Sequence, residues 1–445
     1  MLDTDGAQMF PSPIIKRIRT KVFSDIKITN PDRTDNLTGG AEGREAAFGA
    51  LCRILAKCGG EIRNLSGAAE ELYKFFETDA EYSERLKKVI ESMKSPEPEL
   101  LTRKNVRAIY GDVIALSATK LEKYNDCAFS YFMRYGLVAK ERVSGKLDSR
   151  DTGSIQHNAL YRYFSELKFN NADYGEITYD RCRKRVCEIV EQAAKENSEL
   201  LYESSFYFKY IVSRMQGIVT RTAWETIKFY KSGAFRPYGY EIKIATGGDI
   251  PTICIKADDG TDLAHLHGFI DRADTAVING KTYVSIIDYK SSKTDLDSAL
   301  TDAGVKLQPL LYSDIVCKRL NASPAAMLYM QMTDPIIKAE NLKSDENSAV
   351  ELAKSKEVDF GGWVNNDAAV IANYSNGENG ETFLPSKNHF MSESEMTEHI
   401  EKANENIKNA ARGIYKGNIS AKPFVCKGHS ACTYCPYSLS CSKEE

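Results

Sequence analysis

Residues 268–290 read GFIDRADTAVINGKTYVSIIDYK, and this stretch predicts two strands joined by a tight turn. Asn279-Gly280 lies at its centre, and the residues on both sides alternate between apolar and polar. This dipeptide is a strong signal for a two-residue type I′ hairpin turn, which fixes the register of the two strands. Counting outward from the turn places Asp271 directly opposite Asp288. A bulge in either strand would shift that register by one residue.

The predicted hairpin carries two carboxylates on one face. Because side chains alternate along a strand, Asp271, Asp288 and Lys290 share this face and Tyr289 points away. Directly opposed like charges destabilise a sheet, so a bound divalent cation is a natural compensation; Mg²⁺ commonly takes one or two protein carboxylates. The alternative is an ordinary hairpin with solvent-facing acidic residues. The neighbours on the same face suggest burial instead: they are Ala273, Thr275, Val284 and Ile286.

Other segments of the chain show helical or strand-like spacing of apolar residues. Helical spacing is found at about 43–110, 154–167, 168–230, 296–315 and 395–414. Strand-like alternation is found at 238–245, 263–278, 281–290 and 325–332. Ser117 is a predicted N-cap for a helix that continues past Tyr131. Residues 1–40 are predicted to be a loop, and residues 334–388 are mostly polar and predict little.

The composition excludes several classes of protein. With 445 residues the chain is longer than one hydrophobic core usually supports, so two domains are expected. Hydrophobic residues make up 42% and charged residues 27%, which is typical of a globular protein. We find no apolar run of membrane-spanning length and no signal peptide, so we expect a cytoplasmic protein without membrane association. The net charge of −3 gives no global reason to expect nucleic acid.

The eleven cysteines need an explanation. A chain without an export signal argues against a disulfide framework, which leaves buried thiols, catalysis or metal binding. Six lie in apolar-periodic segments and are predicted to be small buried hydrophobes: Cys52, Cys58, Cys182, Cys187, Cys254 and Cys317. Three more lie within ten residues, at a spacing suited to a soft metal: Cys432, Cys435 and Cys441. The candidates for a fourth ligand are Cys127, Cys426 and His429, and completion by Cys426 or His429 would indicate zinc.

The order of motifs along the chain resembles one group of nucleases. An Asp followed by Asp-x-Lys on the next strand, here GFIDRAD and IIDYKSS, is the core of the PD-(D/E)xK superfamily. SATKLEKYNDCAFSYFMRYGL and GSIQHNALYRYF precede these strands, and QPLLY and CTYCPYSLSC follow them. This order is similar to the RecB-type nucleases with an iron–sulfur cluster, and more narrowly to the C-terminal part of the AddB family of bacterial helicase–nuclease subunits. FPSPIIKRI near the start also resembles that family, so the resemblance covers most of the chain.

The resemblance implies a fold and a domain organisation. The fold would be α/β (α+β), with a restriction-endonuclease-like core in which helices flank a central mixed sheet. Residues 1–110 would be a mostly helical remnant of an inactivated helicase region, and residues 111–445 a nuclease domain closed by a cysteine cluster. No GxxxxGK[ST] phosphate loop is found, so no ATP-driven motor is expected. A full AddB is far longer, so the chain would be a C-terminal part of such a protein.

The resemblance also implies roles for individual residues. The ligands of Mg²⁺ (or Mn²⁺) would be His157, Asp271 and Asp288. Lys290 would be the catalytic lysine beside the two aspartates. Gln308 and Tyr312 match a QxxxY motif that lies near the DNA backbone in this group. Glu241 matches a frequently acidic position, although an outward-facing strand carboxylate explains it equally well.

For the cysteines, the resemblance selects Cys127 as the fourth ligand of a [4Fe–4S] cluster with Cys432, Cys435 and Cys441. Such a cluster would join two segments that are far apart in the sequence. Most relatives have Cys-Pro-Phe at the first ligand, whereas this chain has Cys127-Ala128-Phe129, a difference that affects the turn but not the ligand.

Three hypotheses for the function follow. The first is a metal-dependent DNA exonuclease that works with an AddA-type helicase–nuclease subunit on double-strand DNA ends, on the 5′-ended strand, in recombinational repair. The second is a non-catalytic DNA-binding or scaffold subunit with a structural cluster. The third is a free-standing iron–sulfur exonuclease of the CRISPR adaptation type. The complete set of acidic residues and lysine favours the first over the second, and the helicase-like start favours it over the third.

Overall fold

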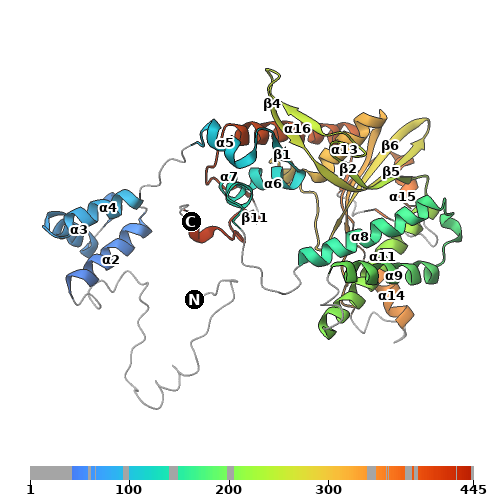
Figure 1. The fold of residues 1–445 in the computed structure, drawn as a ribbon, viewed down its shortest axis with the longest axis horizontal. Helices are drawn as coiled ribbons and strands as arrows, with labels where there is room; N and C mark the ends of the chain where they lie inside the picture. Colours follow the sequence, from blue (N-terminus) through green and yellow to red (C-terminus); the bar gives the residue numbers. More distant parts are fainter. Residues whose placement is uncertain are drawn as a thin grey trace, which may run out of the picture. The chain divides into compact units, whose positions relative to one another are not determined.

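The computed structural model describes residues 43–58, 62–65, 67–93, 100–139, 149–197, 205–337, 347–356, 358, 360–375, 383–384, 389–426 and 428–441. The loop predicted for residues 1–40 lies outside this part. Two compact units divide the chain between Glu97 and Pro98, and we treat each by itself (Figure 1).

The first unit is helical. It contains α2 (Arg44–Lys57), α3 (Ala68–Thr78) and α4 (Ser83–Met93), with a short 3₁₀ turn at Ile62–Asn64. Its core is formed by a small group of buried side chains that includes Phe48, Leu51, Leu55, Phe76 and Tyr82. The predicted helical spacing is therefore confirmed in this unit.

The second unit is built on a mixed six-stranded sheet in the order β2-β5-β6-β7-β8-β9. The strands are β2 (Arg236–Ile244), β5 (Gly268–Ile278), β6 (Lys281–Lys290), β7 (Ser323–Gln331), β8 (Phe360–Asn365) and β9 (Phe390–Met391). Neighbouring strands are antiparallel except for β6 with β7 and β8 with β9, which run parallel.

The β5–β6 hairpin has the predicted turn and register. Asn279 and Gly280 both have positive φ angles, 53° and 79°, as a type I′ turn requires. Pairing runs without a shift from Ile278 opposite Lys281 to Arg272 opposite Ile287. The hairpin therefore contains no bulge, and the predicted order of its two faces is confirmed.

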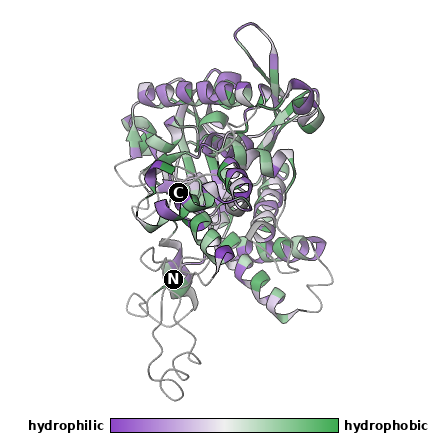
Figure 2. Ribbon diagram, turned by 90° about the vertical axis from the view of Figure 1, so that its left-hand side faces the viewer, coloured by the Kyte–Doolittle hydropathy of each residue, from purple (hydrophilic) through white to green (hydrophobic). Residues whose placement is uncertain are grey.

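Helices cover both faces of this sheet (Figure 1). One face packs against α8 (Ser149–Phe169) and α11 (Phe206–Ser232), and α9 (Tyr179–Asn197) packs against these two helices. The other face packs against α6 (Ala118–Asp126), α13 (Gln308–Leu320) and α16 (Glu393–Tyr415). Figure 2 shows hydrophilic and hydrophobic residues alternating along the helices, as expected when one side of each is buried. The prediction of a central mixed sheet flanked by helices is confirmed.

The remaining helices are short. They are α5 (Arg103–Tyr110), α7 (Ala128–Tyr131), α12 (Ser298–Asp302), α14 (Asn347–Lys356) and α15 (Ala368–Ser375). Val106 of α5 is fully buried in the core of the second unit, so this helix belongs to that unit. The predicted helix after Ser117 is interrupted, because Cys127 adopts an extended conformation (φ −165°) between α6 and α7.

Two small sheets complete the second unit. The first has the order β1-β4-β3 and contains β1 (Ile114–Leu116), β3 (Ile253–Lys256) and β4 (Asp262–Leu266). The strand predicted at 263–278 is thus divided between β4 and β5. The second small sheet pairs β10 (Val425–Cys426) with β11 (His429–Ser430).

Candidate active site

Three carboxylates lie side by side on neighbouring strands at one end of the main sheet. The pairs Tyr240 with Arg272 and Ile242 with Ile270 bracket Glu241 and place it opposite Asp271 across β2 and β5. The β5–β6 pairing ends with Arg272 opposite Ile287. Asp271 and Asp288 are the next residues on the two strands and therefore lie opposite each other. The β2–β5 and β5–β6 registers together therefore create the row Glu241, Asp271 and Asp288.

Burial on this face agrees with the sequence prediction. Ala273, Val284 and Ile286 are fully buried next to the row, and Thr275 is half-buried. Tyr289 belongs to the core on the opposite face of the sheet, as the alternation of side chains along β6 predicts. The two aspartates therefore do not lie on a solvent-facing hairpin.

His157 reaches the row from α8. Its Nδ1 lies 3.5 Å from Asp271 Oδ2 and 3.8 Å from Glu241 Oε1. One donor atom from each of these three residues lies within 4.8 Å of the others, a spacing at which they could hold one metal ion. Burial by itself would lower the pKa of His157, but Asp271 and Glu241 outweigh it and raise this pKa to about 10.

Asp288 lies beneath this group and is 1% exposed. Burial and the nearby Asp271 carboxylate raise the pKa of Asp288 to about 7. Lys290 Nζ lies 2.5 Å from Asp288 Oδ2, but neither Asp288 oxygen takes part in a hydrogen bond of acceptable geometry. Buried carboxylate oxygens without such partners are costly, and a cation at this position would satisfy them.

Lys290 is held between two sides of the site. Its Nζ donates a hydrogen bond to Gln308 Oε1 at 3.1 Å, in addition to the ion pair with Asp288. Burial lowers the pKa of Lys290, but the nearby carboxylates of Asp288, Asp271 and Glu122 together outweigh it, and the net shift is upward. Lys290 is therefore a charged donor at the edge of the carboxylate row.

Gln308 is the first residue of α13, with Pro309 next to it as the N1/N2 proline. Glu122 of α6 accepts hydrogen bonds from the backbone N–H groups of Leu307 and Gln308, at 2.7 and 3.0 Å. This half-buried carboxylate caps the start of the helix, a position where negative charge is favourable. The sequence analysis missed Glu122, and no spacing rule links it to a helix start 186 residues away.

Tyr312 lies one turn after Gln308 and is buried, and its hydroxyl lies against Gly268 at the start of β5. Burial raises the pKa of Tyr312, and the charges of Asp288 and Asp271 add to this rise. The structure thus brings the QxxxY pair next to the carboxylate row.

Glu241 adopts φ +47°, which is uncommon for a residue with a side chain inside a strand. Such backbone strain persists only where the surroundings impose it, and it often marks functional positions. The half-buried Glu241 carboxylate faces His157 at 3.8 Å. It is therefore part of the acidic group and not an ordinary outward-facing strand residue.

An open cleft of about 980 Å³ gives access to this group. The start of α8 and the ends of β2, β5 and β6 line it, and its lining includes His157, Glu241, Asp271 and Lys290. Arg162, Lys243 and Asp249 also line it, so charged groups of both signs surround the opening.

The cysteine-rich segment folds back onto the junction between α6 and α7. The backbone N–H of Phe424 donates to Asp126 O at 2.8 Å, and that of Phe129 donates to Ser420 O at 3.2 Å. His429 Nε2 lies 2.8 Å from Asp126 Oδ1, so this nitrogen already has a partner. These contacts bring together segments about 300 residues apart.

Cys127 is buried at that junction. Burial raises the pKa of its thiol, and the nearby Cys441 and Cys435 thiols add to the rise. Among the described residues, no three of the thiols Cys127, Cys432, Cys435 and Cys441 lie within 4.8 Å of one another.

These features define the class of protein. A profile of the PD-(D/E)XK nuclease superfamily matches residues 115–442, and the chain belongs to this superfamily. More narrowly, the chain is 28% identical over 99% of its length to the B-type subunit of the ATP-dependent helicase/deoxyribonuclease of Clostridium acetobutylicum. The identity is also 28%, over 99% of the chain, to the proteins of the same name from Clostridium botulinum (strain Okra / Type B1) and Caldanaerobacter subterraneus subsp. tengcongensis. In each case the chain spans 40% of the relative's length.

Within the part of the chain that the structure describes, none of the helices combines the length and the apolar character needed to cross a bilayer.

Proposed function

We propose that this chain is the nuclease region of a helicase–nuclease subunit and hydrolyses phosphodiester bonds in DNA with Mg²⁺ or Mn²⁺. The observation that carries the proposal is the row Glu241, Asp271 and Asp288 beside Lys290. Glu241, Asp271 and Lys290 line an open cleft. The relatives are named as parts of a helicase/deoxyribonuclease, and these names support DNA as the substrate.

The donor set fits a hard divalent cation. Oxygen ligands suit Mg²⁺ and Mn²⁺, and one imidazole is compatible with either. His157, Asp271 and Asp288 are the proposed ligands. Donor atoms of His157, Asp271 and Glu241 lie within 4.8 Å of one another, which adds Glu241 as a fourth proposed ligand. Asp288 Oδ2 is paired with Lys290, whereas the buried Oδ1 has no hydrogen bond, which agrees with a cation at this oxygen.

Different residues of the chain have different proposed roles in the hydrolysis. A divalent cation, when bound, supplies Lewis acidity towards a phosphate oxygen. Lys290, fixed by Asp288 and Gln308, orients the attacking water or donates to the phosphate as negative charge builds up. Gln308 and Tyr312 are proposed to lie along the DNA backbone next to this position. Hydrolysis would leave a 5′-phosphate and a 3′-hydroxyl.

The test is cleavage of end-labelled duplex DNA by Asp288→Asn and Asp271→Asn variants. Each variant should cleave about 100-fold more slowly or worse, because the loss of one group that stabilises charge in the transition state typically costs this much in rate. DNA binding should be unchanged. Asp249→Asn is the matched control: this carboxylate lines the same cleft but only accepts a hydrogen bond from the backbone of Lys243. Unchanged cleavage by Asp288→Asn would refute the site.

The same assay separates the alternatives. DNA labelled at either end reports whether the 5′-ended strand is degraded, as we propose. Wild-type protein that binds DNA but cleaves none with Mg²⁺ or Mn²⁺ would favour the scaffold hypothesis. Cleavage without any association with an AddA-type helicase–nuclease subunit would favour the free-standing exonuclease. A role on DNA ends in recombinational repair also implies the bacterial cytoplasm as the location.

We also propose that Cys127, Cys432, Cys435 and Cys441 hold a [4Fe–4S] cluster. Support comes from the return of the cysteine-rich segment to the junction that holds Cys127. Anaerobically purified protein should be brown, with a broad absorption band that Cys432→Ala abolishes. Colourless protein with stoichiometric zinc lost in the same variant would refute the cluster.

The helical unit within residues 43–93 lies outside the residues that match the nuclease superfamily, whereas the relatives align over 99% of the chain. We propose that this unit, together with the residues before it, is a remnant of an inactivated helicase region. If so, deletion of residues 1–97 should lower the rate at which duplex DNA is cleaved in the presence of the AddA-type subunit, because this DNA must first be unwound. The same deletion should leave the cleavage of single-stranded DNA unchanged.

A further inference from the structure

Cys254 departs from the sequence prediction, which grouped it with the small buried hydrophobes. Its side chain is exposed on the outer face of β3. Directly across the strand pair lies His265 of β4, because the register pairs Cys254 with His265. Opposed side chains in an antiparallel pair have Cβ atoms roughly 4.5–5.5 Å apart, so a thiol and an imidazole meet on this face.

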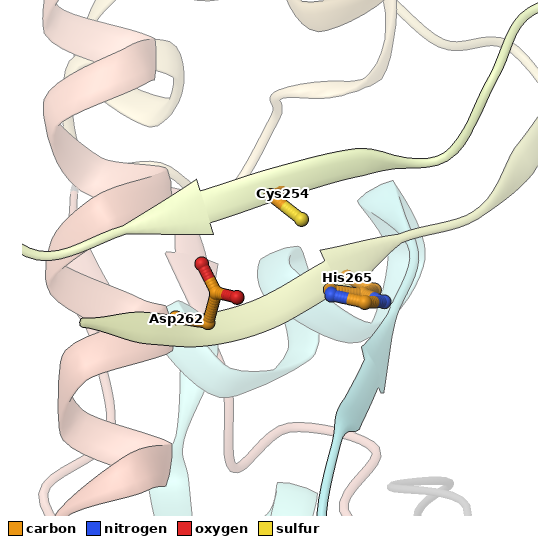
Figure 3. A group of neighbouring side chains, drawn as sticks. All are labelled: Cys254, Asp262 and His265. Carbon is orange, nitrogen blue, oxygen red and sulfur yellow. The ribbon is translucent and has the colours of Figure 1, made fainter. Parts of the chain in front are cut away.

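A bulge adds a third donor. The register shifts between Ile255 and Lys256, so that Ile255 pairs with Ala264 and Lys256 with Asp262. In a regular strand Asp262 and His265, three residues apart, would point to opposite faces. The extra residue in β4 reverses this parity and brings Asp262 to the face of His265. Figure 3 shows the three side chains on the two strands.

The donor atoms of these residues form a compact group. One sulfur, one carboxylate oxygen and one imidazole nitrogen lie within 4.8 Å of one another. A tetrahedral zinc ion with bonds of about 2.0–2.3 Å holds its donors roughly 3.3–3.8 Å apart, so small side-chain rotations suffice to close the group. This mixture of S, N and O donors is suited to zinc and not to Mg²⁺ or Ca²⁺.

The strand pair that carries the group is firmly seated. Ile255, Leu263 and Leu266 point to the other face and are buried in the core of the second unit. Such a base keeps the backbone positions of the three donors fixed, which lowers the cost of assembling a site. Lys256 Nζ lies 3.7 Å from Asp262 Oδ1 and would compete with a cation for this carboxylate.

We propose that Cys254, Asp262 and His265 form a zinc site on the outer face of the β3–β4 hairpin, separate from the carboxylate row and from the cysteine-rich segment. Three protein ligands leave one coordination position for water or for a donor from another molecule. The site links the two strands, so zinc stabilises the hairpin that leads directly into β5.

The test is equilibrium binding of Zn²⁺ to the full chain, measured by competition with a chromophoric chelator. Because other cysteines in the chain can bind zinc, the decisive quantity is the difference between wild type and variant. Cys254→Ser and His265→Ala should each remove one equivalent of bound Zn²⁺ or weaken its binding by about tenfold or more. Loss of a residue that only hydrogen-bonds to a metal ligand already weakens metal binding on this scale, and loss of a ligand should cost at least as much. Equal binding by wild type and both variants would overturn the proposal.

Two control variants sharpen the result. Asp258→Asn changes a carboxylate of the hairpin loop that pairs with Arg412, and it should leave the zinc count unchanged. Lys256→Ala removes the competing cation and should tighten binding. With Co²⁺ as the probe, wild type should show a sulfur-to-metal charge-transfer band that Cys254→Ser lowers. Unfolding curves recorded with a strong chelator should coincide for wild type and variants, since all three side chains lie at the surface; a zinc loss that follows unfolding would count against the site.

Discussion

A buried ion pair on the back of β5 is predicted to contribute strongly to the stability of the second unit. Arg272 and Asp274 are 3% and 0% exposed. Arg272 donates to Asp274 Oδ2 from Nε at 2.8 Å and from Nη2 at 2.5 Å, and its Nη1 donates to Thr226. The Tyr230 hydroxyl donates to the other Asp274 oxygen at 2.8 Å. Asp274→Ala would remove all the Asp274 bonds and leave a buried guanidinium without its counter-charge.

The expected loss is about 3–5 kcal/mol, because breaking one half of a buried pair leaves an uncompensated charge. This is a large part of the roughly 5–15 kcal/mol that stabilises a typical domain. The matched control is Glu166→Ala, which breaks the pair with Arg185 in which the side chains are 42% and 45% exposed. An exposed pair of this kind contributes at most about 1 kcal/mol.

The assay is urea unfolding followed by tryptophan fluorescence. The chain has two tryptophans, Trp224 on α11 and Trp363 on β8, and both lie in the second unit, so the signal reports this unit alone. Arg272→Met combined with Asp274→Ala should recover at least half of the loss, since the charge is then gone. A loss below about 1 kcal/mol for Asp274→Ala would refute the reasoning, because the buried pair would then equal the surface pair.

Three further predictions use the same unfolding assay, and the second also uses cleavage kinetics. Gly362→Ala should destabilise the protein by several kcal/mol, because Gly362 has φ +114° and a Cβ there would lie 2.1 Å from Met327 O. Gly217→Ala on α11 is the control: a Cβ there meets nothing within 4 Å, so this change should stabilise the protein by about 0.5–1 kcal/mol. Glu122→Ala should raise the KM for DNA, because the backbone N–H groups of Leu307 and Gln308 at the start of α13 lose their hydrogen-bond acceptor. Glu122→Gln keeps an acceptor oxygen and should raise the KM less. Ser117→Ala should cost about 1 kcal/mol, since its side chain accepts from the Lys120 N–H at the start of α6; a loss as large for Ser117→Asp would argue against the cap.

The sequence predicted those elements that depend on local rules. Asn279-Gly280 determines a turn type, and the turn determines the register, so the arrangement of Asp271 and Asp288 followed from counting residues. The cap at Ser117 is equally local. By contrast, β8 was missed, because Gly361 and Gly362 hide the apolar alternation of FGGWVN, although close packing against Met327 requires glycine at position 362.

The rest of the site depends on contacts that no spacing rule reveals. Glu241 joins the acidic group through the pairing of β2 with β5 and an unusual φ angle, and neither can be read from YGYEIKI. Glu122 meets Gln308 only in the folded unit. Cys254 alternates with the buried Ile255 along β3 and lies on the exposed face of the small sheet. The apolar spacing of this segment alone did not show which face would be covered.

The return of the cysteine-rich segment to Cys127 sets a time order for folding. Ser420, Phe424 and His429 form hydrogen bonds with Asp126 and Phe129 at the junction of α6 and α7. A ribosome that adds about 5–20 residues per second needs roughly 15–60 s to cover the 303 positions between Asp126 and His429. During this interval the sheet and its acidic row can already form, while the α6–α7 junction stays open. The unit is therefore closed late in synthesis, and a product interrupted before residue 420 would carry the acidic row without the segment that closes the unit.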